Sequence, residues 1–282
     1  MKLDILGHDD PTMIRTLEDY ITSDAMENEY NEEHPFVATE IPLDDKKVIE
    51  LFHGTEILGI KPEDIDGCKL GCLGIPEFGT DFVIQMVQDT KPQTLSDLIR
   101  ISGLSHGTNV WLGNAQELVK SGKATISTAI CTRDDIMIYL INKGVESALA
   151  FTIMESVRKG KGLKPEWEEA MKAQDVPDWY IWSCKKISYM FPKAHAAAYV
   201  MMAYRIAYCK INYPLAYYGA YFGIRADAFS YAIMCQGKDK LNYYMKDYKK
   251  RSDTLTKKEQ DVMKVYEDCP GNVRARTGVY AD

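Results

Sequence analysis

Apolar residues recur every three or four positions along most of this chain, the spacing that gives a helix one buried side. Strand-like character is confined to one short apolar run, residues 3–6, which ends at Gly7. Asp10 followed by Pro11 predicts an N-cap and the first turn of a helix that continues through residues 12–21. The pattern predicts further helices at residues 44–52, 80–88, 94–102, 113–121, 134–143, 147–158, 165–173, 178–190, 195–213, 239–250 and 256–267. The expected fold class is therefore mainly α, with a short β-strand at the N-terminus.

Two stretches lack this periodicity. Residues 23–45 are strongly acidic, which predicts an exposed loop or insertion. Residues 54–79 are rich in glycine and predict an irregular segment between helices. Neither stretch is a low-complexity tract, and no internal repeat of solenoid length is present.

Composition and charge narrow the class of protein. The 282 residues are 46% hydrophobic and 27% charged, as in a soluble globular protein of one large or two small domains. A net charge of −7 argues against a protein that coats nucleic acid. Basic residues nevertheless cluster at 157–161 and 238–251, so a local basic site on an acidic protein stays open.

The cysteines and the apolar runs indicate the cellular compartment of the protein. The seven cysteines are an odd number, and only Cys68 and Cys72 lie close together, so reduced thiols are favoured over disulfides or a zinc site. No apolar run reaches the roughly 18 residues of a membrane helix. The first residues do not follow the pattern of a signal peptide. We expect a cytoplasmic protein with no membrane partner.

The first candidate for chemistry is Asp4, an acid inside the apolar run 3–6. A buried carboxylate is costly unless it is paired or binds a metal, but a lone acid on an edge strand is more often solvated. Asp9 and Asp10 follow as possible partners, and helix capping explains Asp10 without any chemistry. Local sequence alone favours the solvated interpretation of Asp4.

A second candidate is the sequence MESVRKGKG, in which Arg158, Lys159 and Lys161 alternate with two glycines. Cations at the end of a helix are stabilised by its dipole, which is an adequate structural explanation. A mobile glycine-bearing turn would equally let the three cations converge on one polyphosphate. The two interpretations are balanced at this level.

Two further segments carry polar groups that could recognise a ligand. In FPKAHAAAYV, Lys193 and His195 fall in the first turn of a helix, where an anion could be held; a packed core helix with a satisfied histidine is the alternative. Residues 101–116 predict a polar loop between helices containing Ser105 and His106. A catalytic triad of these two with Asp134 has no support from the sequence.

Taken together, these segments resemble one family. The chain is similar to the PolC family of bacterial replicative DNA polymerases, which belongs to the C-family polymerases, over about residues 2–227, in the family's order and spacing. The matching segments are long: KLDILGHDDPTMIRTLEDY, LGIPEFGTDFVIQMVQDTKPQTLSDLIRISGLSHGTNVWLGNAQ, RDDIMIYLINKG, AFTIMESVRKGKGL and KKISYMFPKAHAAAYVMMAYRIAYCKINYPLAYYGAYF.

The resemblance implies helical polymerase fingers preceded by a short palm β-strand. It implies an end of the palm at residues 1–22, an acidic insertion and short helix at 23–52, fingers at 53–235, and a truncated charged helical tail at 236–282. It assigns the third catalytic carboxylate, a metal ligand, to Asp4, which reverses the local interpretation. Residues implied to bind the incoming nucleotide are Arg158, Lys159, Lys161, Lys193, His195, Tyr199, Ser105, His106 and Gly107.

The chemistry that the resemblance implies is nucleotidyl transfer from a deoxynucleoside triphosphate (dNTP) to a primer 3′-hydroxyl, with two Mg²⁺ ions as cofactors. The implied partners are primer–template DNA, the dNTP, the rest of the polymerase chain, and the sliding clamp and replisome through regions beyond this chain. The family's Asp-x-Asp motif is missing here, and Asp64-Ile65-Asp66 is expected to be solvated. We therefore expect a fragment that is inactive alone; the alternative is a non-catalytic nucleotide- or DNA-binding helical module, or the product of a decayed gene.

Overall fold

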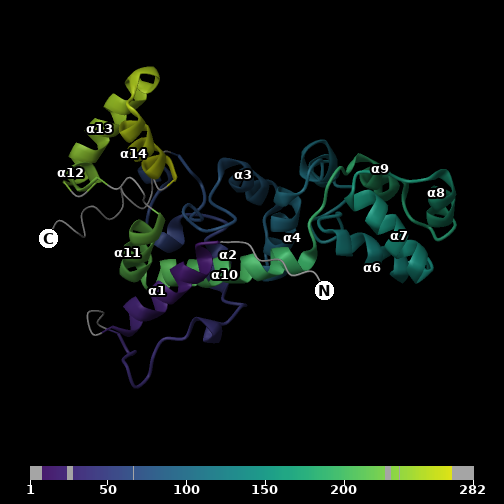
Figure 1. Cartoon of the computed structure of the whole chain (residues 1–282), viewed down its shortest axis with the longest axis horizontal. Helices are drawn as coiled ribbons and strands as arrows, with labels where there is room; N and C mark the ends of the chain where they lie inside the picture. Colours follow the sequence, from purple (N-terminus) through teal and green to yellow (C-terminus); the bar gives the residue numbers. More distant parts are fainter. Residues whose placement is uncertain (1–7, 24–27, 66, 226–229, 235, 269–282) are drawn as a thin grey trace. The chain divides into compact units, whose positions relative to one another are not determined.

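The computed structural model describes residues 8–23, 28–65, 67–225, 230–234 and 236–268. Within these residues the fold is built from helices (Figure 1), and the β-structure is one isolated bridge between Thr108 and Tyr189. The mainly α class is therefore confirmed. The strand predicted at residues 3–6 lies outside the described residues.

The chain forms two compact units. The first unit combines residues 1–80 with residues 202–282, and the second unit is residues 81–201. The long helix α10 (Lys193–Asn212) contributes its first residues to the second unit and its last residues to the first. The α-helices that lie wholly in the described part of the first unit are α1 (Asp10–Thr22), α2 (Lys46–Glu50), α11 (Pro214–Arg225), α12 (Tyr231–Met234), α13 (Lys238–Lys250) and α14 (Lys257–Asp268).

Helix α1 packs against α11. Its buried face is Met13, Leu17 and Ile21, which follow one another at the four-residue spacing of a helix. The N-cap is Asp9, so the prediction that Asp10 caps this helix is wrong. Asp10 is only 1% exposed and pairs with Arg225 at the end of α11. Asp10 therefore links α1 to α11 by an ion pair instead of capping the N-terminus of α1.

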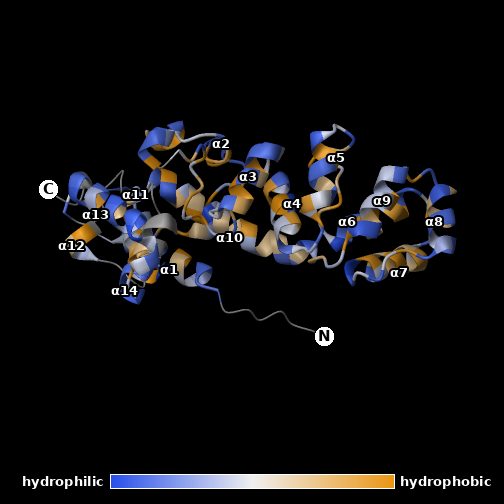
Figure 2. Cartoon of the chain, turned by 90° about the horizontal axis from the view of Figure 1, so that it is seen from above, coloured by the Kyte–Doolittle hydropathy of each residue, from blue (hydrophilic) through white to orange (hydrophobic). Residues whose placement is uncertain are grey.

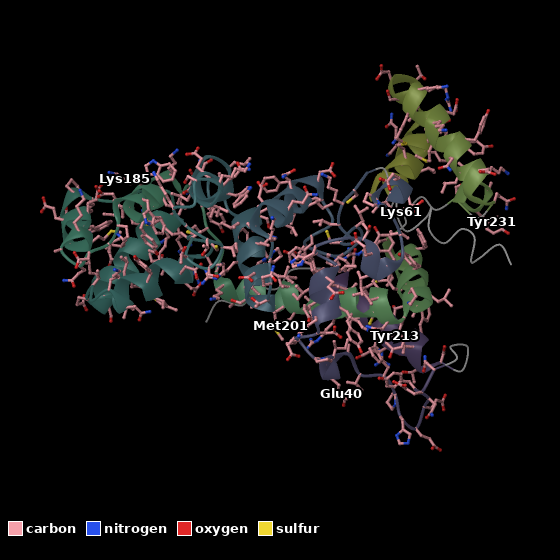
Figure 3. The ribbon with its side chains drawn as sticks, turned by 180° about the vertical axis from the view of Figure 1, so that it is seen from behind. Glu40, Lys61, Lys185, Met201, Tyr213 and Tyr231 are labelled. Carbon is pink, nitrogen blue, oxygen red and sulfur yellow. The ribbon has the colours of Figure 1, made fainter. Side chains whose placement is uncertain are left out.

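The acidic segment is irregular, as predicted, but part of it is buried. Phe36, Ala38 and Ile41 are at most 5% exposed. The Phe36 ring lies edge-on to Tyr30 at 5.2 Å and to Tyr213 at 5.4 Å; Tyr213 is labelled in Figure 3. The expectation of a wholly exposed loop is thus corrected, because these three apolar residues pack onto the first unit.

Lys210 holds the glycine-rich segment in place. Its ammonium is buried and donates to the carbonyl oxygens of Gly71 at 2.8 Å and Leu73 at 2.6 Å. The hydroxyl of Tyr217 donates to the next carbonyl, that of Gly74, at 2.9 Å. Buried carbonyls outside regular structure need such donors. Two side chains from α10 and α11 therefore supply donors to carbonyls of residues 71–74, which lie outside any helix.

The second unit begins with α3 and continues through the first residues of α10. Its helices are α3 (Asp81–Thr90), α4 (Leu95–His106), α5 (Gln116–Lys120), α6 (Arg133–Asn142), α7 (Ser147–Arg158), α8 (Pro165–Lys172) and α9 (Asp178–Lys186). Helices α6 and α7 pack together. Figure 2 shows the contrast between the apolar α7 and the polar α8.

Most helix positions agree with the sequence pattern, with three corrections. Helix α9 ends at Lys186 and not at residue 190, because the chain then runs extended beside Thr108. Helix α4 continues to His106, so the predicted loop at residues 101–116 is half helical. Helices α11 and α12 were not predicted; the first is apolar nearly all round and therefore shows no clear period.

One further finding concerns membranes. Among the described helices, none combines the length and the apolar character that crossing a lipid bilayer requires.

Candidate functional site

Residues 187–192, the extended segment after α9, bring the predicted site residues together in the second unit. The amide of Thr108 donates to the carbonyl of Tyr189 at 2.9 Å, and the amide of Ser188 donates to the carbonyl of Thr108 at 3.0 Å. The amide of Met190 donates to the carbonyl of Arg158 at 3.3 Å. The ends of α4 and α7 are therefore both bonded to the segment that leads into α10.

A cluster of rings lies at the junction of this segment with α4 and α10. The centroid of the His106 ring lies 5.4 Å from that of Phe191 and 5.7 Å from that of His195. His195 also lies 5.0 Å from Phe191 and 4.6 Å from Tyr199, and it is only 9% exposed. The structure thus joins residues from two separate motifs, whose proximity the sequence could not show.

The residues beside His106 fix its position. Nδ1 of His106 lies 2.8 Å from the carbonyl oxygen of Ser102 and 3.1 Å from Oγ of Ser105. A Cβ atom at Gly107 would lie 2.8 Å from the carbonyl oxygen of Tyr189, which is closer than real Cβ contacts allow. Glycine at position 107 is therefore required for the close approach of the two backbones.

The cations at the end of α7 are organised by a carboxylate that the sequence analysis did not single out. Arg158 donates from Nε and Nη2 to Glu155, the second bond being 2.9 Å, and Nζ of Lys159 lies 2.8 Å from the same carboxylate. These hydrogen bonds, first that of Arg158, lower the pKa of Glu155 to about 2. Lys161 is exposed and has no recorded ion pair in the described part of the chain. Three cations and one carboxylate leave two excess positive charges.

A glycine-bearing turn carries these cations. Gly160 and Gly162 have φ angles of +70° and +71°, which L-residues with a side chain rarely adopt. Oγ of Ser156 closes the turn by donating to the carbonyl of Gly162 at 2.9 Å. A Cβ atom at Gly160 would lie 2.5 Å from the carbonyl oxygen of Ser188, whereas nothing lies within 4 Å of one at Gly162.

This contrast predicts different costs for two similar substitutions. Gly162→Ala should lower the free energy of unfolding by about 1 kcal/mol, the cost of a positive φ in alanine. Gly160→Ala should cost at least about 1 kcal/mol more, because the methyl group also displaces the 187–192 segment. Urea denaturation of the two variants measures the difference. Equal costs would show that the backbone of Ser188 does not approach Gly160 in solution.

The pKa of Glu155 predicts a pH dependence. A carboxyl whose folded pKa is depressed contributes stability above its ordinary pKa of 4.5, and this contribution is lost as the pH falls toward about 2. Glu155→Gln should therefore lower the free energy of unfolding by about 1 kcal/mol at pH 7, a value limited by solvent screening. The difference between the two proteins should decrease as the pH falls through about 2 and vanish below that value. A difference that stays constant from pH 7 to pH 2 would contradict the ion pairing.

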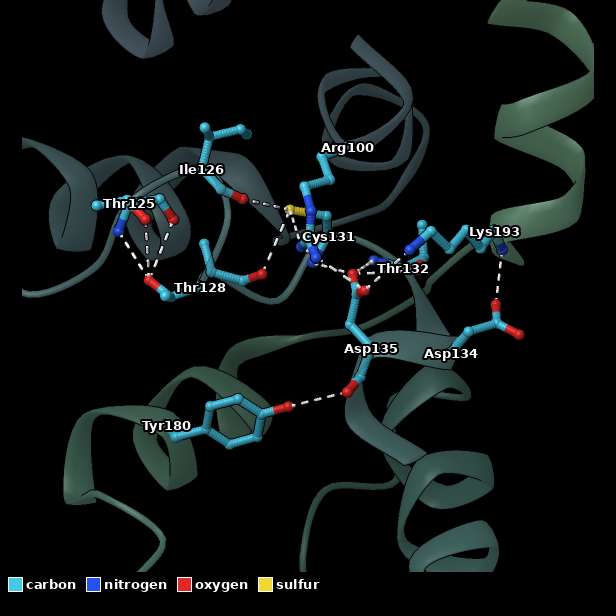
Figure 4. Close-up of polar contacts among 11 residues, drawn as sticks. Arg100, Thr125, Ile126, Thr128, Cys131, Thr132, Asp134, Asp135, Tyr180 and Lys193 are labelled. Carbon is cyan, nitrogen blue, oxygen red and sulfur yellow. Dashed lines mark hydrogen bonds and ion pairs between the residues drawn. The ribbon is translucent and has the colours of Figure 1, made fainter. Parts of the chain in front are cut away.

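The sequence suggested that the N-terminus of α10 could hold an anion. In the structure a carboxylate of the protein, that of Asp134, already binds there (Figure 4). The amide of Lys193 donates to Oδ2 of Asp134 at 2.6 Å. Oδ1 of Asp135 lies 3.6 Å from Nη1 of Arg100 and 4.0 Å from Nζ of Lys193. The first amide of α10 is therefore already occupied by a carboxylate of the protein. Asp134 accepts from the backbone of Lys193, which agrees with the rejection of a triad of Ser105, His106 and Asp134.

The remaining predicted residue, Asp4, lies outside the described residues. Within them, no group of three or more His, Cys, Asp or Glu side chains could hold a metal ion. Sequence reasoning missed Glu155 and Asp135 as partners of the cations, and it missed Asp134 as the acceptor for the backbone amide of Lys193. The spacing of Thr132 and Asp135, a capping box, was the available signal for Asp135.

Comparison with known proteins identifies the family of this chain. Residues 10–175 match the family model described as the finger domain of the bacterial DNA polymerase III alpha subunit, and the chain belongs to this family. The curated relatives include proteins named DNA polymerase III PolC-type. That of Bacillus subtilis (strain 168) is 56% identical over 267 residues, that of Staphylococcus aureus (strain MW2) 55%, and that of Oceanobacillus iheyensis 53%. In each case the match covers 95% of this chain but 18% of the relative, so the chain spans less than a fifth of the length of these relatives.

Proposed function

We propose that this chain is the fingers part of a PolC-type DNA-directed DNA polymerase and binds the incoming dNTP during nucleotidyl transfer. The observation that supports this best is the convergence of three separate motifs on the 187–192 segment. Arg158, His106 and His195 come from α7, α4 and α10, and each contacts that segment. A frame that brings a glycine-bearing basic turn and a cluster of rings onto one segment suits a ligand that carries both phosphates and a base.

In this proposal the residues have distinct roles. The basic turn of Arg158, Lys159 and Lys161 neutralises the charge on the β- and γ-phosphates, where negative charge builds during transfer. Glu155 orients Arg158 and Lys159 before the nucleotide arrives. Lys193, His195 and Tyr199, with Ser105, His106 and Gly107, line the neighbouring part of the nucleotide site.

The proposed cofactors are two Mg²⁺ ions, which would stabilise the attacking and leaving oxygens. Asp4 is proposed as one of the carboxylate ligands. One carboxylate cannot hold two ions by itself, so we propose that the other ligands come from the rest of the polymerase chain. We therefore propose that the 282 residues alone do not extend a primer.

The remaining proposals concern organisation and partners. Residues 1–22 are proposed as the end of the palm, 23–52 as an acidic insertion with a short helix, 53–235 as fingers and 236–282 as a charged tail. The proposed partners are primer–template DNA, the rest of the polymerase chain, and the clamp and replisome through regions outside this chain, all in the cytoplasm. The alternative proposal is a non-catalytic nucleotide- or DNA-binding helical module, or the product of a decayed gene.

Titration of the chain with a dNTP tests the nucleotide site. Arg158→Ala should weaken binding at least about tenfold, because a charge-assisted hydrogen bond contributes roughly 1.5–3 kcal/mol. The matched control is Lys164→Ala, which removes a cation that is 63% exposed and lies beyond the turn. No measurable dNTP binding, or equal losses in the two variants, would contradict the proposal.

Primer extension separates the two candidate functions. A polymerase fragment should restore Mg²⁺-dependent extension when the missing palm is supplied as a second polypeptide, and should show none alone. Extension by the isolated chain would refute its proposed inactivity. A chain that binds dNTP but never restores extension would support the non-catalytic module.

A further inference from the structure

Helix α13 in the first unit has one buried side and one fully exposed side. Leu241, Met245 and Tyr248 are at most 6% exposed and follow one another at helical spacing, so they define the inner side. The opposite side carries Tyr243, Lys246 and Lys250, which we call the α13 face. These positions are separated by three and four residues and therefore lie in one row along the helix.

The α13 face presents a ring between positive charges. Tyr243 is 68% exposed, and both lysines are exposed. The adjoining helix α12 exposes another ring, Tyr231, also by 68% (Figure 3). Single exposed apolar residues are ordinary on a protein surface, so these rings bear on function only together with the charges beside them.

The charges on this face are not neutralised by the acids around it. Asp247 and Glu259 instead engage Arg251, at 2.7 Å and 3.1 Å. In the described part of the chain no ion pair is recorded for Lys246 or Lys250. Residues 238–251 contain six Lys and Arg and two Asp, a net charge of +4 in a chain whose net charge is −7. The positive charge is therefore concentrated here.

The combination of lysines and an exposed ring fits single-stranded nucleic acid. Lysines neutralise phosphates, and a base stacks on an aromatic side chain only when it is unpaired. Protein interfaces are depleted in lysine, so an acidic protein partner fits this face less well. Lys246 and Lys250 are one helical turn apart, about 6 Å along the axis, which lets them follow one strand.

We propose that the α13 face binds the unpaired template strand, with a base stacked on Tyr243 and phosphates bound by Lys246 and Lys250. This rests on the proposed function only in that the chain meets primer–template DNA. It uses none of the residues of the nucleotide site, which lie in the other unit.

Fluorescence anisotropy with a labelled single-stranded oligonucleotide tests this site in the 282-residue chain. Tyr243→Ala should weaken binding about tenfold without changing its salt dependence, since stacking contributes roughly 1–3 kcal/mol per base. Tyr243→Phe should retain binding, which separates stacking from loss of structure. Replacing both lysines by alanine should reduce the slope of log K against log salt by about 1.4, or about 0.7 per phosphate.

The matched control is the double variant Lys257→Ala and Lys258→Ala, which removes the same charge from exposed positions of α14. It should change the affinity less than twofold. An equal loss in the control, an equal effect of Tyr243→Ala on a blunt duplex, or no binding of the oligonucleotide would overturn the inference. Variants of the α13 face should keep their dNTP affinity, so failure of this site and failure of the nucleotide site are distinguishable.

Discussion

Replacing Lys210 with methionine should lower the free energy of unfolding of this chain by about 3 kcal/mol. The ammonium is 2% exposed and donates to the buried carbonyls of Gly71 and Leu73 at 2.8 and 2.6 Å. Two charge-assisted bonds of roughly 1.5–3 kcal/mol each are lost, and two acceptors are left without this donor. Removing a buried charge offsets part of that loss, because the folded protein no longer has to keep the ammonium out of water. Urea denaturation gives the net value.

Lys186→Met is the matched control for this substitution. Nζ of Lys186 also donates to a backbone carbonyl, that of Gly113 at 2.9 Å, but the side chain is exposed. Water can replace this donor, so the expected cost is below about 0.5 kcal/mol. Similar losses in the two variants would show that burial of Lys210 does not determine the stability of the glycine-rich segment.

Replacing Asp10 with alanine should also cost about 3 kcal/mol. The carboxylate is 1% exposed and joins α1 to α11 through Arg225, which is 24% exposed. Removing one partner of a buried pair leaves the other charge without compensation, and the partial exposure of Arg225 keeps the cost at the lower end of the usual range. Arg15→Ala is the control, because it removes a pair between Arg15 and Asp19 on the outer side of the same helix. It should cost less than about 1 kcal/mol.

A pH titration gives an independent check on Asp10. Burial raises the pKa of Asp10 above its ordinary value of 3.8, against the opposing charges of Arg225 and His8. The native state therefore keeps the proton to a higher pH than the unfolded state does. The free energy of unfolding of the unsubstituted protein therefore rises relative to that of the Asp10→Asn variant as the pH falls through the raised pKa toward 3.8. Below 3.8 this difference no longer changes. A difference that shrinks over this range would mean that the ion pair, and not burial, dominates.

The order of helices could be predicted from the sequence because their apolar faces have a clear period. Helix α7 was predicted with its observed bounds, Ser147–Arg158. The helical period did not predict the elements whose existence or limits depend on tertiary packing. Helix α11 is apolar on nearly all sides, and α9 stops early because residues 187–192 bond to Thr108, more than 70 positions earlier.

In the candidate site, too, the sequence identified individual residues but not the contacts between them. Long segments resembling one family identified Arg158, His106 and His195 as residues of interest, and the family match to residues 10–175 agrees with that resemblance. Their proximity to one another depends on backbone bonds between distant loops. The presence of Asp134 at the N-terminus of α10 likewise depends on a contact between residues 59 positions apart. Local patterns cannot report such contacts.

The sequence by itself determined that this chain is mainly helical, and its long segments placed it with the polymerase fingers. Both properties are local, since helical period and motif spacing are set by neighbours along the chain. Only the tertiary structure decided that Glu155 organises the basic turn, that Asp134 occupies the end of α10, and that Asp10 and Lys210 are buried. The physical reason is that burial and charge pairing depend on which elements pack together, and packing joins residues far apart in the sequence.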